Sequence, residues 1–176
     1  MPDSVQVPVL SYIGLGSNLS NNQGDSQAIF RQAVQALSGY GQLQVSGLYA
    51  SKPLGPQDQP DFINAALSLL TTLPPFALLD VLQQLEQDAG RIKLRHWGER
   101  TLDLDLLLYG SEVIRSERLT VPHSGILQRH FVMLPLLDLN PQLQVAGHFL
   151  QDQLNTLPQD DIRKITDSSW LQHSIP

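Results

Sequence analysis

The chain has 176 residues, of which 41% are hydrophobic and 16% charged, and its formal net charge is −6. These values predict one globular domain, residues 1–176, large enough to bury a core without disulfides. The chain has no cysteine, no secretory signal at its start and no apolar run of membrane-spanning length, which favours a cytoplasmic protein with no membrane partner. The acidic balance argues against nucleic acid as a partner, because binding a phosphate backbone needs a broad basic surface.

The first part of the chain predicts a strand–helix–strand unit. Val7–Leu15 is apolar enough for a central strand, and the glycine-rich run Gly14-Leu15-Gly16-Ser17-Asn18 follows as a turn. This turn lacks the third glycine of a dinucleotide-binding fingerprint, so a Rossmann site is rejected. A helix is expected from about Gln23 to Leu37, with Asp25 among the residues able to cap its start, and Leu43–Tyr49 reads as the next strand.

A second unit of the same kind follows an irregular, proline-rich loop over residues 51–61. Phe62–Leu73 predicts a strand, Pro74-Pro75 opens a helix, and Gly90 suits the position just after its end. The order of elements predicts an α+β fold of the ferredoxin-like split βαβ type, with a four-stranded antiparallel sheet backed by helices. After these units we expect an appended hairpin, a C-terminal helix near Ile126–Leu137 and a polar tail over about 151–176. The sequence does not place this tail in the fold.

Leu102–Tyr109 is the most informative strand, because its leucines alternate with two aspartates. Period-2 alternation predicts that Asp103 and Asp105 share one face, roughly 6–7 Å apart, while Leu102, Leu104, Leu106 and Leu108 point into a core. The aspartates could simply be solvent-exposed side chains on the open face of a sheet. Aspartate is a poor strand former, however, and Arg100 lies just upstream, so a site for a divalent cation and an anionic substrate is the preferred interpretation.

Cations are concentrated before this strand, where Arg91, Lys93, Arg95 and Arg100 occupy ten residues. A locally basic loop on an acidic protein fits a small phosphorylated ligand, although a solvated basic loop is the alternative. No P-loop motif is present, so phosphate binding must use other groups.

Four motifs together resemble the hydroxymethyldihydropterin pyrophosphokinase family of folate synthesis, in order from Tyr12 to about Pro141. They are G-L-G-S-N-L at 14–19, P-L-G-P-Q-D-Q-P-D-F-I-N at 53–64, R-T-L-D-L-D at 100–105 and V-P-H at 121–123. The resemblance implies an enzyme that transfers diphosphate from ATP to the hydroxymethyl oxygen of the pterin and releases AMP. It also implies two Mg²⁺ ions and a monomer that acts on small molecules.

The resemblance further implies a role for particular residues. Asp103 and Asp105 would hold the metal ions, and Arg91, Arg100 and Asp105 would be catalytic. The ATP site would comprise Gln83, Arg91, Trp97, Arg100, Leu106, Thr120, His123 and Arg129. The pterin site would comprise Ser51, Leu54, Phe62, Asn64, Trp97 and Phe131, with the two phenylalanines stacked on the ring.

The sequence departs from the family pattern at several positions, notably Lys52, where a proline is expected beside the pterin site, and also His96, Glu99 and Ser124. Two alternatives stay open. One is a different Mg-dependent nucleotidyl or phosphoryl transferase, which would release other products from ATP. The other is a non-catalytic ligand- or metal-binding module, since a fold does not dictate a function.

Overall fold

The computed structural model describes residues 6–19, 24–90, 99–159 and 161–172. The strands are β1 (Val9–Ser17), β2 (Gly41–Val45), β3 (Leu48–Ser51), β4 (Phe62–Thr71), β5 (Asp103–Tyr109), β6 (Ile114–Arg115), β7 (Thr120–Val121), β8 (Gln144–Val145), β9 (His148–Phe149) and β10 (Ile162–Thr166). The α-helices are α1 (Ser26–Leu37), α2 (Pro75–Asp88), α3 (His130–Leu139) and α4 (Leu150–Leu154). No helix in these ranges is long and apolar enough to cross a membrane.

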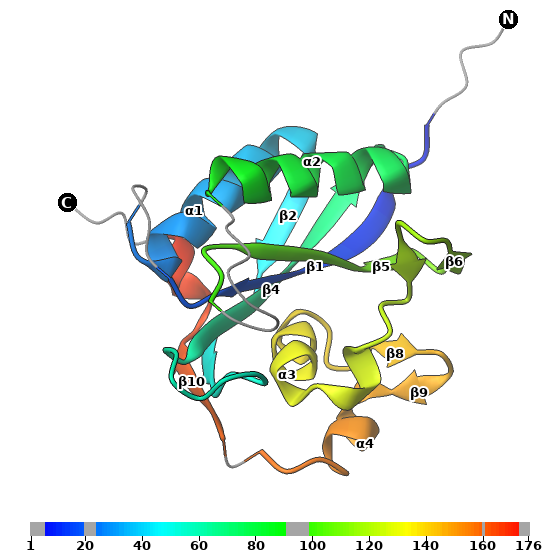
Figure 1. Ribbon diagram of the computed structural model, residues 1–176. Helices are drawn as coiled ribbons and strands as arrows, with labels where there is room; N and C mark the ends of the chain where they lie inside the picture. The colour runs from blue at the N-terminus through cyan, green and yellow to red at the C-terminus, as the bar shows by residue number, and fades with distance from the viewer. Residues whose placement is uncertain (1–5, 20–23, 91–98, 160, 173–176) are drawn as a thin grey trace, which may run out of the picture.

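One main sheet organises the chain. Its strands run in the order β10-β3-β4-β1-β5, with β2 also paired to β4, and every pairing is antiparallel. Helices α1 and α2 cover one face, while α3 lies against the other face, with α4 beside it (Figure 1). The antiparallel sheet backed by helices is therefore confirmed, but it has six strands where four were predicted.

One additional strand arises because the predicted strand Leu43–Tyr49 is interrupted at Ser46 and Gly47, which separates β2 from β3. The backbone N–H of Ala66 donates to Ser46 Oγ at 2.8 Å in place of a ladder acceptor. A Cβ on Gly47 would lie 2.4 Å from the backbone oxygen of Thr166, so only glycine fits here. The interruption thus makes room for the C-terminal segment.

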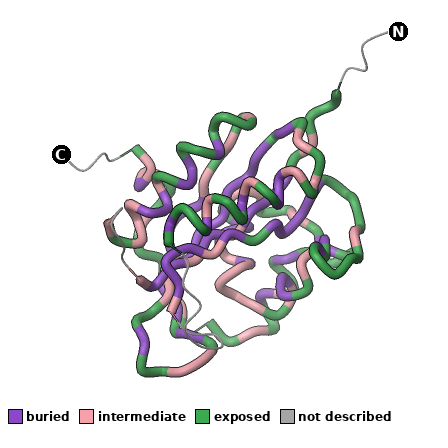
Figure 2. Tube along the Cα trace, turned by 45° about the horizontal axis from the view of Figure 1, so that its top comes forward, coloured by how far each residue is buried: buried purple, intermediate pink, exposed green. Residues whose placement is uncertain are grey.

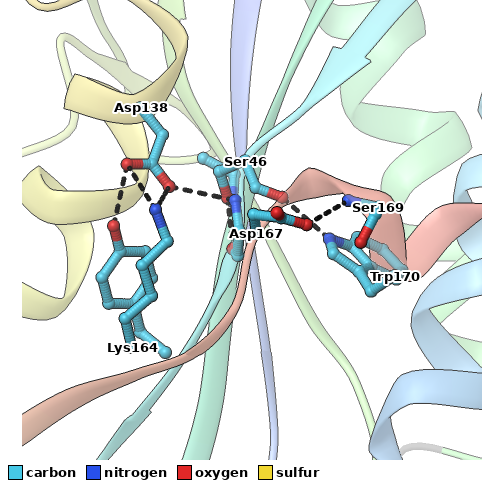
Figure 3. A network of polar contacts seen from close by, with 9 residues as sticks. Ser46, Asp138, Lys164, Asp167, Ser169 and Trp170 are labelled. Carbon is cyan, nitrogen blue, oxygen red and sulfur yellow. Dashed lines mark hydrogen bonds and ion pairs between the residues drawn. The ribbon is translucent and has the colours of Figure 1, made fainter.

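The other additional strand is β10, which comes from the tail that the sequence did not place. It pairs with β3, and the 3₁₀ turn Ser168–Leu171 follows it. Trp170 is 1% exposed and donates its Nε1–H to the Ser46 carbonyl at 2.8 Å (Figure 3). Its ring also meets the Phe30 ring edge-on. The structure therefore places the tail, which forms an edge of the sheet and contributes a core residue.

The sheet separates two apolar clusters, and buried residues lie along its central strands (Figure 2). Ile13 and Leu67 belong to the cluster under α1 and α2, whereas Leu107 and Leu136 belong to the cluster under α3. All four leucines predicted for the core are buried. A register shift in the β1–β5 pairing turns Leu108 toward the second cluster instead of the first, because a bulge reverses the facing of later residues.

The helix ends follow the sequence signals. Asp25 caps α1 by accepting the Ala28 N–H at 2.9 Å, and Pro75 occupies the first turn of α2. Gly90 follows α2 with a φ of +74°, the left-handed conformation that glycine adopts at low cost. Both helices are thereby fixed against the sheet beside the strands that carry the candidate site.

Candidate functional site

The two aspartates and the two glycines of the first motif face each other across β1 and β5. Gly16 pairs with Asp103 and Gly14 with Asp105, while Asn64 of β4 pairs with Gly16 from the other side. A Cβ on Gly16 would sit 3.9 Å from both the Asn64 Oδ1 and the Asp103 Cβ. The bare glycine backbone thus leaves an open floor between an amide and a carboxylate.

This floor belongs to a cavity that the described residues form between the sheet, the proline-rich loop and the start of α3. All the residues predicted for the pterin site that the structure describes line it, as do both aspartates. These residues are Ser51, Leu54, Phe62, Asn64, Phe131, Asp103 and Asp105. Residues from four separate parts of the chain are therefore brought together as the resemblance implies.

The polar groups of this cavity are held by short contacts. Asn64, which is buried, donates from Nδ2 to Ser51 Oγ at 2.7 Å, so its amide orientation is fixed. Arg100 is also buried, and its Nε lies 3.8 Å from Asp103 Oδ1. Arg129 lines the same cavity, so a second arginine belongs to its wall. The cavity thus combines apolar walls with charged groups of both signs.

Asn18 of the first motif connects the proline-rich loop to Arg100. Its Oδ1 accepts the Arg100 backbone N–H at 2.8 Å, and its Nδ2 donates to Gln59 Oε1 and to the Pro60 carbonyl, both at 3.0 Å. The Arg100 carbonyl in turn accepts the Asn18 backbone N–H at 2.9 Å. The glycine-rich run was predicted as a turn, but residues 14–17 belong to β1, and Asn18 directly after that strand positions other parts of the site.

A second cavity lies on the other side of β5. Four of the residues predicted for ATP line it, namely Gln83, Leu106, Thr120 and His123, and Asp105 lines it as well. His123 accepts the Gly125 N–H on Nδ1 at 3.0 Å, so in the neutral ring the proton resides on Nε2. Asp105 therefore borders both cavities.

Sequence reasoning missed three charged residues that line the second cavity, Glu86, Glu117 and Arg118. Arg118 donates to Gln83 Oε1 at 3.0 Å and forms an ion pair with Asp80. Glu86 is 5% exposed, and its Oε2 accepts the N–H of Leu104, the residue between the two aspartates, at 2.9 Å. A charged residue on the core-facing side of α2 was the available signal for Glu86.

Two predicted residues, Arg91 and Trp97, lie outside the described residues, as do Lys93, Arg95 and His96. Two other residues predicted for ATP, Arg100 and Arg129, line the first cavity instead of the second. In the part of the chain that the structure describes, no group of three or more histidine, cysteine, aspartate or glutamate side chains is placed to hold a metal ion.

Concave, largely apolar cavities with a few polar groups are typical small-molecule sites, and two of them share Asp105 here. A sequence profile of the 7,8-dihydro-6-hydroxymethylpterin-pyrophosphokinase (HPPK) family matches residues 12–141. The chain therefore belongs to the HPPK family.

Individual relatives agree with this assignment. The chain is 49% identical over 135 residues to 2-amino-4-hydroxy-6-hydroxymethyldihydropteridine pyrophosphokinase of Haemophilus influenzae, covering 77% of this chain and 84% of that one. The protein of the same name from Pseudomonas aeruginosa is 43% identical over 155 residues, which cover 88% of this chain and 95% of the relative.

A solved structure shares the fold at low sequence identity. A Plasmodium falciparum HPPK-DHPS variant with pterin and p-hydroxybenzoate superimposes with a TM-score of 0.71 at 12% identity, covering 92% of this chain and 47% of that one.

Proposed function

We propose that this protein transfers diphosphate from ATP to the hydroxymethyl group of 6-hydroxymethyl-7,8-dihydropterin in folate synthesis and releases AMP. The observation that carries the proposal is the position of Asp105, which borders both the cavity with the predicted pterin residues and the cavity with the predicted ATP residues. A group at that junction is adjacent to both the phosphate donor and the hydroxyl acceptor. Family membership supports the same reaction.

Within the first cavity, Phe62 and Phe131 would stack on the planar pterin, and the buried Asn64 amide would bind its edge. Arg100 and Arg129 would neutralise the phosphate oxygens, whose negative charge increases and spreads during the transfer. The Asp105 carboxylate would accept the hydroxyl proton. For the residues outside the described ranges, Arg91 would also be catalytic and bind ATP, while Trp97 would contact both substrates.

We further propose that Asp103 and Asp105 hold two Mg²⁺ ions. The donor set fits, because Mg²⁺ is usually bound through one or two carboxylates and takes its other ligands from substrate phosphates and water. A closed protein cage is not needed for such a site, and none is found among the described residues. When bound, the ions would neutralise charge on the triphosphate and orient it for the attack.

The proposal also includes a single domain over residues 1–176 of the ferredoxin-like type, a cytoplasmic location and a monomer without nucleic-acid partners. The interleaved units β1–α1–β2 and β4–α2–β5 support the ferredoxin-like comparison, with β4 and β1 adjacent at the centre of the sheet.

The products formed from ATP test the function directly. Purified protein is incubated with ATP and Mg²⁺, with and without the hydroxymethyldihydropterin, and the nucleotides are separated by chromatography. We expect AMP and the pterin diphosphate in equal amounts, and AMP formation only when pterin is present. ADP would indicate a monophosphate transfer, release of pyrophosphate would indicate a nucleotidyl transfer, and ligand binding without any product would indicate a binding module.

Asp105→Asn tests the shared carboxylate in the same assay. Because Asp105 is exposed and on the face opposite the first core, the variant is expected to fold and to lose roughly 100-fold or more in kcat, as for other electrostatic groups acting on a transition state. Asp152→Asn, at an exposed position of α4, removes the same charge elsewhere and is expected to retain full activity. Equal activity of the two variants with saturating Mg²⁺ would contradict the assignment.

A further inference from the structure

The C-terminal strand β10 lies outside the family-matched residues 12–141 but contacts β3 and α3, two elements that also contribute residues to the first cavity. Its first residue, Ile162, pairs with Ser51 at the end of β3, where the proline-rich loop begins. On the other side, Lys164 Nζ lies 3.5 Å from the Asp138 carboxylate of α3 (Figure 3). The strand therefore connects the loop wall of the cavity to the helix wall.

The contact nearest the cavity joins Asp161 to His130. Asp161 Oδ1 lies 2.5 Å from His130 Nε2, and His130 is the first residue of α3. The His130 ring meets the adjacent Phe131 ring edge-on, with centroids 5.9 Å apart and an interplanar angle of 67°. Phe131 lines the cavity, so Asp161 holds a ring that packs against the stacking surface proposed for the pterin.

Lys52 completes this cluster and gives a structural context for its departure from the family pattern. Its side chain lines the cavity at the end of β3. The hydrogen bond from His130, and to a smaller extent the positive charge of Lys52, lower the pKa of Asp161 below its ordinary value. The Asp161 carboxylate is therefore ionised at neutral pH, which strengthens its contact with His130.

We propose that Asp161 is a positioning residue for the pterin, acting through His130 to hold Phe131 in its stacking orientation. Asp161 does not line the cavity among the described residues, so it acts indirectly. The inference rests on the proposed function, because it assumes that the first cavity binds the pterin. It assigns a role in substrate affinity to a segment beyond the region that the family profile matches.

The test compares pterin and ATP affinity in the full-length protein. Asp161→Asn is expected to raise the pterin KM and Kd by about three- to tenfold, the effect of weakening one hydrogen bond to a charged group, while kcat and the ATP KM stay within about twofold. His130→Gln is expected to have a similar effect, and the double variant no larger an effect than either single one, since both changes remove one interaction. Asp161→Glu is expected to restore part of the affinity.

Two further variants separate positioning from general stability. Asp152→Asn removes an exposed charge on α4. Asp138→Asn removes the charge that pairs α3 with Lys164 of β10, and the Asp138 carboxylate also accepts from Gly47 N–H and Tyr49 OH. Asp138→Asn is expected to lower the melting temperature without raising the pterin Kd preferentially.

An unchanged pterin Kd in Asp161→Asn would overturn the inference, as would an equal rise in the pterin and ATP constants. The AMP assay on the wild-type protein judges the proposed function separately. Pterin Kd values from fluorescence titration decide the role of Asp161 even if no AMP forms, and a wild-type protein that binds no pterin would overturn both.

Discussion

Asn18→Ala removes a side chain that joins three parts of the site through the contacts described above. Asn18 is 6% exposed and makes one hydrogen bond with the Arg100 backbone and two with the proline-rich loop, at Gln59 and Pro60. Alanine retains the β-carbon only, so all three bonds are lost together. The buried Arg100 N–H loses its Asn18 acceptor, and two loop acceptors lose their donor.

The expected loss of unfolding free energy follows from these groups. Depriving a buried N–H of its acceptor costs about 1–3 kcal/mol, and each further neutral hydrogen bond contributes about 0.5–1.5 kcal/mol. Because the loop can relax and its acceptors can bind water, we expect a total of about 2–4 kcal/mol. Asn18→Asp keeps an acceptor for Arg100 but buries a carboxylate with one oxygen facing the Gln59 and Pro60 acceptors, so its loss is expected to be at least as large.

Urea denaturation of the variants measures this loss. The control is Asn155→Ala, because Asn155 is exposed and its side chain accepts one hydrogen bond, from Gln151 at 3.2 Å; a change of less than about 0.5 kcal/mol is expected there. The kcat of Asn18→Ala is also expected to fall, since Arg100 and the loop lose a common support. A destabilisation no larger than that of Asn155→Ala would refute the reasoning.

Three other outcomes test the site and its surroundings. Phe131→Ala is expected to raise the pterin KM and leave the ATP KM unchanged in steady-state assays, with exposed Phe149→Ala as control; equal loss for both ligands would indicate a core role. Thr101→Val is expected to stabilise the protein by about 1 kcal/mol in urea titrations, since the buried Thr101 hydroxyl has no hydrogen-bond partner among the described residues; a less stable variant would show that the hydroxyl is satisfied. Because the folded pKa of Asp161 is lowered, its stabilising contribution is present above the ordinary aspartate pKa and lost as pH falls through the folded value. Wild type is thus expected to be more stable than Asp161→Asn at pH 7, by a margin that vanishes as the pH falls through the folded pKa of Asp161, and a difference that persists in strong acid would contradict this.

The central elements were predictable because their signals are local. The alternation of β5, the cap of α1 and the prolines at the start of α2 each specify structure within a few residues. The break between β2 and β3 was not predictable in this way. Its cause is the approach of Thr166 to Gly47, a contact between segments far apart in the sequence.

The site shows the same division between local and distant information. The resemblance carried over the residue types that line the two cavities. It gave no information on what holds them, such as the Asn18 contacts or the Glu86 carboxylate beneath Leu104. Asp161 illustrates the limit, because it contacts His130 from a segment that the sequence did not place and that joins the sheet as β10.

The residues that contradict strand propensity most strongly are the ones that form the floor of the site. Glycine and aspartate are both poor strand formers, yet Gly14 and Gly16 of β1 lie opposite Asp105 and Asp103 of β5. A side chain on Gly16 would occupy space between Asp103 and Asn64, and a Cβ on Gly14 would come within 3.3 Å of Leu107. Two unfavourable strand residues facing each other therefore produce one open surface that carries carboxylates. These residues lower the stability of the strands that contain them, and a surface able to accept ligands gives the reason for their presence.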